Sequence, residues 1–96
     1  MQLTSKIHLL KHNFCIHFPN GHEVPRFVYS VIVFGSEITL IDSGVKESYL
    51  QIFEYVEKMG RKPSEISRLI LSHSHPDHMG SAAKIKELTM CKVLAH

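Results

Sequence analysis

Residues 73–78 read HSHPDH, and this hexapeptide closely follows the apolar run RLIL at residues 68–71. An apolar run between turn-forming segments is typical of a buried strand, so a strand is predicted to end just before the histidines. Four side chains of metal-ligating type therefore stand within six positions in the loop after a strand. This feature constrains the fold most, because loops at the carboxyl ends of parallel strands are where sites form in α/β proteins.

Hydrophobic patterning elsewhere predicts an antiparallel start followed by alternating strands and helices. The predicted strands span residues 5–10, 13–18, 27–34, 38–41, 68–71 and 91–95, and the predicted helices span residues 46–59 and 81–89. Helical spacing places Tyr49, Ile52, Phe53, Val56 and Met59 on the inward face of the first helix, and Ala82, Ile85 and Leu88 on that of the second. Gly60 and Pro63 end the first helix. The last three strands are expected to be parallel, with right-handed crossovers.

The side chains of residues 73–78 suit a pair of metal ions. His73 and His75 are two apart, so in an extended loop both imidazoles can reach one ion. Pro76 is expected to start a turn, after which Asp77 and His78 can ligate a second ion. Two ions about 3.5–4 Å apart lower the pKa of a shared water toward neutrality and polarise a substrate oxygen. Asp77 is then also a catalytic candidate, because its carboxylate can hold the proton of the nucleophile.

Asp42 follows the predicted 38–41 strand, so it should lie at the same sheet edge as His73. Two interpretations stay open: Asp42 caps local backbone N–H groups, or it orients a ligating histidine.

The other histidines lack ligand spacing and are predicted to be surface or turn residues; they are His8, His12, His17 and His22. His96 is predicted to be a frayed end rather than a ligand.

Length, charge and cysteine content limit the classes of protein to which this chain can belong. A chain of 96 residues is expected to form one domain at most. A net charge of +2 gives no indication of nucleic acid or of an acidic membrane surface, and no apolar run approaches the ~20 residues of a membrane span. Cys15 and Cys91 form no C-x-x-C pair, and the first residues resemble no signal peptide. Reduced thiols and a cytoplasmic location are therefore predicted.

Residues 71–80, LSHSHPDHMG, resemble the His-x-His-x-Asp-His signature of the metallo-β-lactamase superfamily. The upstream segment LIDSG at residues 40–44 resembles the acidic turn of the same family. The order of hairpin, acidic turn, helix, strand, metal loop and helix also agrees, and the resemblance covers residues 27–96. Ser72 and Ser81 depart from it, because threonine and glycine are common at these places.

The resemblance implies an α/β fold in which residues 1–96 form the N-terminal portion of one αββα sandwich domain, as a mixed sheet with an antiparallel hairpin followed by β-α-β-α-β. It implies two divalent ions, zinc first with iron or manganese as alternatives, held by His73 and His75 and by Asp77 and His78. Asp42 resembles the buried acid of the family. The implied activity is metal-dependent hydrolysis of a small ester, thioester, lactone, amide or phosphoester.

The family takes further ligands from a C-terminal half that this sequence does not contain. We therefore expect a bare apolar sheet face, which recruits a second copy or a complementing C-terminal half, and little activity of the isolated chain. Within the superfamily, a di-iron oxidoreductase and a non-catalytic assembly module stay open as alternatives. Outside it, the tripeptide at residues 75–77 also occurs in J-domain co-chaperones, and residues 75–81 loosely resemble DHH-type phosphoesterases. The strand, hairpin and helix that precede the motif disfavour both of these, and amidohydrolase barrels lack the adjoining Asp-His.

Overall fold

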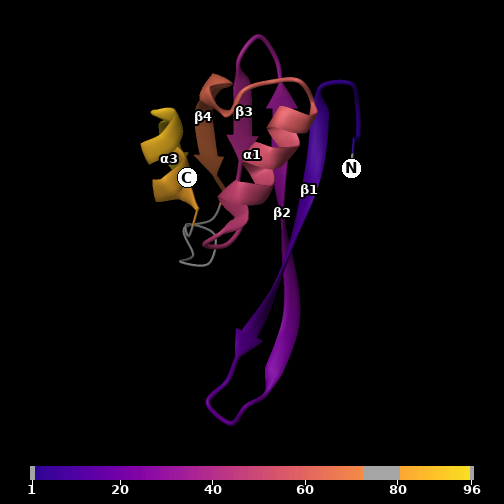
Figure 1. Ribbon diagram of the computed structural model, residues 1–96, viewed down its shortest axis with the longest axis vertical. Helices are drawn as coiled ribbons and strands as arrows, with labels where there is room; N and C mark the ends of the chain where they lie inside the picture. The colour runs from indigo at the N-terminus through magenta and orange to yellow at the C-terminus, as the bar shows by residue number, and fades with distance from the viewer. Residues whose placement is uncertain (1, 73–80, 96) are drawn as a thin grey trace.

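The computed structural model describes residues 2–72 and 81–95. They form strands β1 (Ile7–His17), β2 (Glu23–Phe34), β3 (Ile38–Ile41), β4 (Ile66–Leu71) and β5 (Lys92–Ala95), helices α1 (Ser48–Lys58) and α3 (Ala82–Thr89), and the 3₁₀ turn η1 (Pro63–Glu65) (Figure 1). The predicted elements are present with ends shifted by a few residues, except that the first two predicted strands form the single strand β1. None of the described helices is long and apolar enough to cross a membrane.

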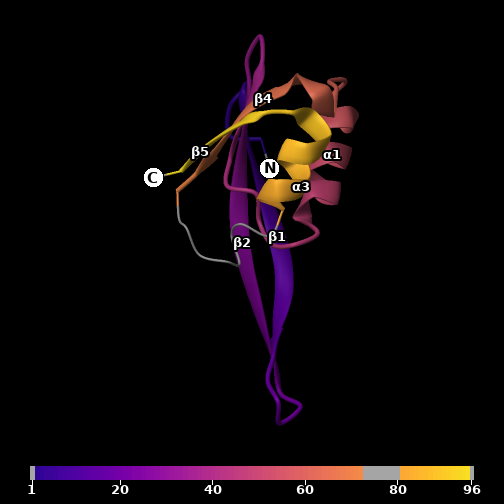
Figure 2. The same cartoon turned by 90° about the vertical axis from the view of Figure 1, so that its left-hand side faces the viewer.

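The five strands form one mixed sheet in the order β1-β2-β3-β4-β5. β1 and β2 pair antiparallel, as do β2 and β3, whereas β3, β4 and β5 are parallel neighbours. The predicted parallel second half is thus confirmed. Helices α1 and α3 both lie on the same face of the sheet, as the view along its edge shows (Figure 2). This arrangement leaves the carboxyl ends of β3 and β4 at one edge, where the predicted metal loop follows β4.

The hydrophobic core lies between this face and the two helices. Ile32, Leu40 and Leu69 are in register on neighbouring strands and are fully buried. Ile52 and Val56 of α1 and Ile85 of α3 belong to the same buried cluster. The helical spacing of the sequence predicted these three inward residues, and the hydrophobic effect explains why they hold the helices on the sheet.

The opposite face of the sheet is apolar but largely open. A row of residues in register crosses all five strands on this face: Leu9, Val31, Ile41, Ile70 and Leu94. All five are half-buried or exposed, and no described helix lies on this side (Figure 2). The prediction that residues 68–71 are buried on both faces was therefore wrong at Ile70. The expected partner for this face, a second copy or a complementing C-terminal half, stays a prediction.

The first hairpin is longer than the sequence indicated. Residues 5–10 and 13–18 were predicted as two strands, but β1 is continuous from Ile7 to His17. β2 begins at Glu23 rather than Phe27, although it includes Pro25. Proline is tolerated there because β3 pairs with β2 only from Val31 onward, so Pro25 needs a partner on one side alone.

Two predicted inward residues at helix ends point to solvent. Met59 is 41% exposed and Leu88 is 51% exposed. Met59 follows α1 as its C-cap, and Leu88 lies in the last turn of α3. Helical spacing gives the direction of a side chain, but burial also requires an opposing surface, which these helix ends lack within the described part of the chain. Gly60 has a positive φ of 79°, which confirms its role in ending α1.

Candidate functional site

The turn after β3 and the end of β4 are joined by the carboxylate of Asp42. Asp42 Oδ1 accepts a hydrogen bond from the backbone N–H of Ser72 at 2.8 Å, and Oδ2 accepts one from the Ser72 hydroxyl at 2.6 Å. The backbone N–H of Asp42 donates to the carbonyl of Ile70 at 2.8 Å. Asp42 adopts a left-handed φ of 61°, which aspartate tolerates better than most residues. Asp42 therefore lies at the edge where β4 ends, whereas His73, the residue after Ser72, lies outside the described residues.

The predicted ligands themselves lie outside the described residues, and they are His73, His75, Asp77 and His78. His96 also lies outside them. Within residues 2–72 and 81–95, no group of three histidine, cysteine or carboxylate side chains could hold a metal ion. The ligand set and the catalytic role of Asp77 stay predictions. The hydrogen bonds of the Asp42 carboxylate go to Ser72, distant in sequence, rather than to local backbone N–H groups, and its orientation of a histidine stays a prediction.

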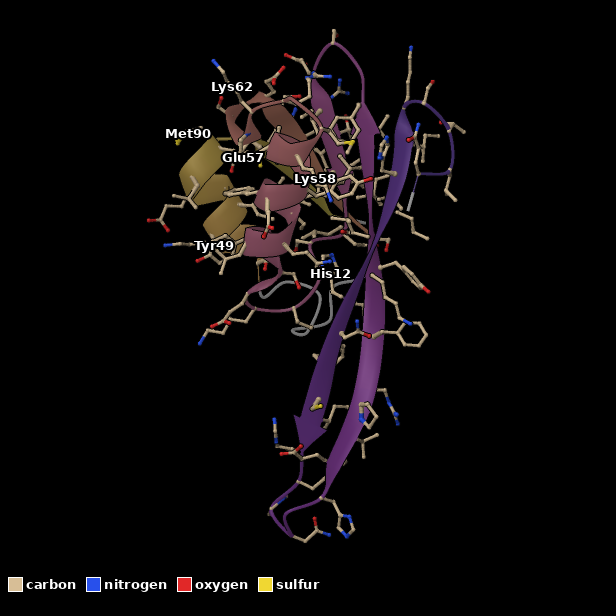
Figure 3. The ribbon with its side chains drawn as sticks, turned by 45° about the vertical axis from the view of Figure 1, so that its right-hand side comes forward. His12, Tyr49, Glu57, Lys58, Lys62 and Met90 are labelled. Carbon is tan, nitrogen blue, oxygen red and sulfur yellow. The ribbon has the colours of Figure 1, made fainter. Side chains whose placement is uncertain are left out.

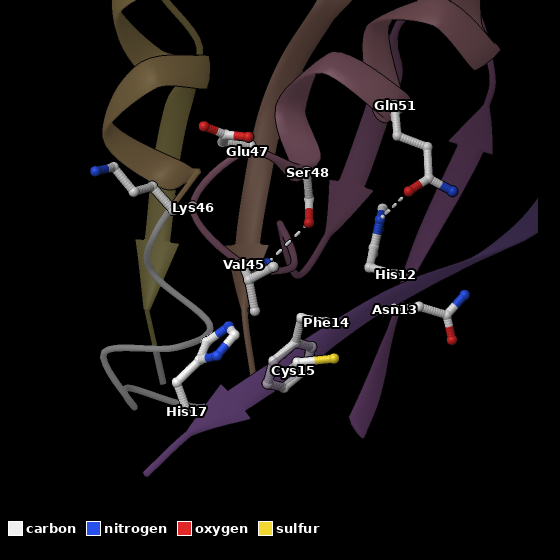
Figure 4. Close-up of a pocket in the computed structure, with 10 residues that line it drawn as sticks. All are labelled: His12, Asn13, Phe14, Cys15, His17, Val45, Lys46, Glu47, Ser48 and Gln51. Carbon is white, nitrogen blue, oxygen red and sulfur yellow. Dashed lines mark hydrogen bonds between the residues drawn. The ribbon is translucent and has the colours of Figure 1, made fainter. Parts of the chain in front are cut away.

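The backbone of the acidic turn is closely packed at Gly44. Gly44 has a φ of 70°, and a Cβ placed on it would lie 2.5 Å from Ser48 Oγ and 2.9 Å from His12 Cδ2. Ser48 Oγ accepts a hydrogen bond from the N–H of Val45 at 2.9 Å, which closes the turn (Figure 4). The turn can approach β1 and the start of α1 this closely only because residue 44 is glycine.

His12 lies beneath this turn and is 1% exposed, so the prediction of a surface histidine was wrong. It points from β1 toward α1, where Nδ1 lies 2.8 Å from Gln51 Oε1 and Nε2 lies 2.7 Å from Ser30 Oγ (Figure 3). Gln51 Oε1 can only accept, so a neutral imidazole donates from Nδ1 and accepts at Nε2 from the serine hydroxyl. Gln51 Nε2 also donates to the carbonyl of Lys11 at 3.0 Å, which agrees with this orientation of the amide.

His8 is also buried, at 3% exposure, so the prediction that it is a surface residue was wrong as well. Its Nδ1 lies 2.5 Å from the Tyr55 hydroxyl, and its ring packs edge-on against Phe34. His17 and His22 are exposed, as predicted. Histidines on the helix-facing side of β1 can be buried because polar groups from α1 and β2 satisfy their nitrogens.

Burial lowers the pKa of His12 below its ordinary value of 6.5, and the hydrogen bond with Gln51 offsets part of that shift. Below about pH 6.5 the unfolded chain binds a proton that the folded chain resists, so stability is expected to fall as the pH is lowered from 7 to 5. Above that pH the contribution is constant. Thermal melts with a chelator present should show a shallower decline over this range for His12→Asn than for the unmutated chain.

The matched control for this measurement is His22→Asn, because His22 is exposed and should keep the pH dependence of the unmutated chain. An unchanged slope for His12→Asn would show that the His12 imidazole does not carry the predicted linkage.

A cavity of about 730 Å³ opens between the outer part of β1 and the acidic turn (Figure 4). One wall comes from β1 and the other from the turn and the start of α1; the lining residues are His12, Asn13, Phe14, Cys15, His17, Val45, Lys46, Glu47, Ser48 and Gln51. The strands β1, β3 and β4 run in the same direction, so the cavity lies at the carboxyl edge where Asp42 meets Ser72. No sequence motif marks Ser48 or Gln51, so these two cavity-lining residues could not be predicted from the sequence. Cys15 is a free, exposed thiol and Cys91 is a free, buried one, and their reduced state stays a prediction.

The mixed sheet with helices on one face, and the acidic turn at the carboxyl edge of its parallel strands, define an α/β fold in which the His/Asp motif follows β4 in the sequence. The family model of the metallo-beta-lactamase superfamily matches residues 24–96. The chain belongs to this superfamily, and its described residues form the corresponding part of that fold.

Solved structures agree with this assignment. A beta-lactamase from Chitinophaga pinensis is 29% identical with a TM-score of 0.63, and covers 68% of this chain and 25% of its own. The metallo-beta-lactamase FEZ-1 from Legionella gormanii gives the same identity, TM-score and coverage. GOB-18 from Elizabethkingia meningoseptica is 29% identical with a TM-score of 0.63, and covers 68% of this chain and 24% of its own. The match thus spans about a quarter of each of these relatives.

Proposed function

We propose that this chain supplies the first metal-binding motif of a metal-dependent hydrolase that acts on a small molecule. The observation that supports this most directly is the pair of hydrogen bonds from Ser72 to Asp42 at the carboxyl edge of the sheet. They join the residue before His73 to the turn that leads into the wall of a cavity of about 730 Å³, a size that suits a small organic molecule.

The donor set fits divalent metal ions. Three imidazoles and one carboxylate, from His73, His75, His78 and Asp77, are the nitrogen and oxygen ligands that zinc takes, and iron or manganese also accept them. Bound ions would supply an activated water and would stabilise negative charge on a substrate oxygen. Within this proposal His73 and His75 serve one ion, and Asp77 and His78 serve the other.

The roles of the protein side chains follow from this placement. Asp77 holds the proton of the attacking water, and Asp42 keeps the start of the loop in place through Ser72. The cavity wall from β1 and the turn binds the organic part of the substrate. An ester, thioester, lactone, amide or phosphoester is the substrate class. Because the matched structures are named beta-lactamases, a β-lactam belongs among the amides to be tested.

Elemental analysis of the purified protein tests this proposal. We expect zinc at one equivalent or more per chain after removal of loosely bound metal, together with hydrolysis of at least one substrate class by the full-length protein. Iron with an optical charge-transfer band would instead indicate the di-iron oxidoreductase. Metal well below one equivalent in a stable oligomer would contradict the proposal and favour the non-catalytic assembly module.

A further inference from the structure

The residue that follows the predicted metal loop is held by the same turn that holds the residue before it. Ser81 is fully buried, and its hydroxyl lies 2.5 Å from the carbonyl oxygen of Val45 and 3.1 Å from that of Lys46. A hydroxyl has one proton to donate, and the shorter contact favours Val45 as its acceptor. Ser81 Oγ also accepts a hydrogen bond from the backbone N–H of Tyr49 at 3.0 Å.

These contacts are tertiary rather than local. Ser81 occupies the N-cap position of α3, where a serine hydroxyl usually accepts a hydrogen bond from its own helix. Here the side chain makes no such cap and is directed instead to the acidic turn. The hydroxyl therefore holds α3 against the turn and does not cap the N-terminus of α3.

The turn that receives Ser81 is itself closely fixed. The Ser48 hydroxyl accepts from the N–H of Val45, and the N–H of Ser48 donates to the carbonyl of Val45 at 2.9 Å. Gly44 packs against Ser48 and His12 with no room for a Cβ. Serines thus hydrogen-bond both the N–H and the carbonyl oxygen of Val45. The position of Val45 is therefore well defined, and the hydrogen bond from Ser81 fixes the start of α3 relative to it.

We propose that Ser81 is a positioning residue for the metal ligands, acting together with Asp42. The stretch 42–49 holds Ser72 through the Asp42 carboxylate and Ser81 through the backbone of Val45, Lys46 and Tyr49. Ser72 and Ser81, the described residues that precede and follow the predicted metal loop in the sequence, are thereby attached to one stretch of chain. Fixed ends restrict the arrangements open to the ligands between them, which raises metal affinity and sets coordination geometry. This inference rests on the proposed function.

Ser81→Ala tests the proposal, because it removes the hydroxyl and leaves the backbone in place. We expect zinc affinity, measured by competition with a chromophoric chelator, to fall about 10- to 100-fold. We also expect the visible absorption bands of the Co²⁺-substituted protein to shift, which a role in stability alone would not cause. The matched control is Ser67→Ala, since the Ser67 hydroxyl, near the start of β4, donates a hydrogen bond to the Glu37 carboxylate at 3.2 Å and should leave both readouts unchanged.

A second variant decides the question if Ser81→Ala does not fold. Ser72→Ala removes one hydrogen bond at the other end of the loop, and Ser72 is exposed, so the variant should fold. Reduced zinc affinity with shifted Co²⁺ bands would support the proposal. Zinc affinity and Co²⁺ bands equal to those of the unmutated protein would overturn it while leaving the proposed function intact. Absence of zinc binding by the unmutated protein would overturn the proposed function and this inference with it.

Discussion

Replacing His75 by alanine is expected to lower the metal affinity of the full-length protein by more than about 100-fold, because it removes a direct ligand rather than a supporting contact. His75 stands two residues after His73 in the motif, where both imidazoles can serve one ion. The measurement is metal stoichiometry by elemental analysis, followed by chelator competition to obtain the affinity. Activity toward any substrate found for the protein should fall with the metal content.

The matched control is His22→Ala, because His22 is an exposed histidine in the turn between β1 and β2 and should leave metal binding unchanged. Far-ultraviolet circular dichroism of both variants would show whether the fold is retained. Unchanged metal stoichiometry in a folded His75→Ala protein would refute the ligand assignment.

Replacing Gly44 by alanine is expected to destabilise the fold by about 3 kcal/mol, for two independent reasons. The left-handed φ of 70° is unfavourable for alanine, and the new methyl group would lie 2.5 Å from Ser48 Oγ and 2.9 Å from His12 Cδ2. For a domain of this size, the midpoint of thermal unfolding should fall by more than about 10 °C. Relieving the overlap would also displace the turn, so metal affinity should fall as well.

Gly60→Ala separates the two causes. Gly60 has a similar φ of 79°, but a Cβ at this position would meet nothing within 4 Å. Its substitution should therefore show the backbone cost alone, with a smaller fall in the midpoint and no effect on metal binding. Equal destabilisation by the two substitutions would show that the close packing of Gly44 contributes nothing.

Much of the fold could be predicted because its elements have clear periodicity. Ile52 and Val56 mark the buried side of α1, and the apolar run at residues 68–71 marks β4. The parallel arrangement follows from the alternation of strand and helix. The continuous course of β1 could not be predicted, because polar residues near its middle, such as Lys11 and His12, resembled a break between two strands.

The buried histidines show why single-sequence reasoning fails at such positions. A polar residue in a strand is assigned to the surface unless its hydrogen-bond partners are known. The partners of His12 are Ser30 on β2 and Gln51 on α1, distant in sequence and unmarked by any motif. The burial of His12 therefore depends on tertiary contacts that only the folded chain reveals.

The same limit applies to the candidate site. Topology places Asp42 and Ser72 at one sheet edge, and this could be predicted from the strand order alone. The attachment of Ser81 to the turn could not, since a serine at the start of a helix is ordinarily interpreted as a cap.

The long β1–β2 hairpin supplies one of the two walls of the cavity. Beyond His12, which is pinned to Gln51, the hairpin arm from residue 13 to residue 29 contains no buried residue. With so little apolar contact, the arm is expected to bend at a smaller free-energy cost than the core. The facing wall at Val45 and Ser48 is held by serine hydroxyls and the packed glycine. We therefore expect a molecule in the cavity to meet one wall fixed by hydrogen bonds and one wall that can adjust to its shape.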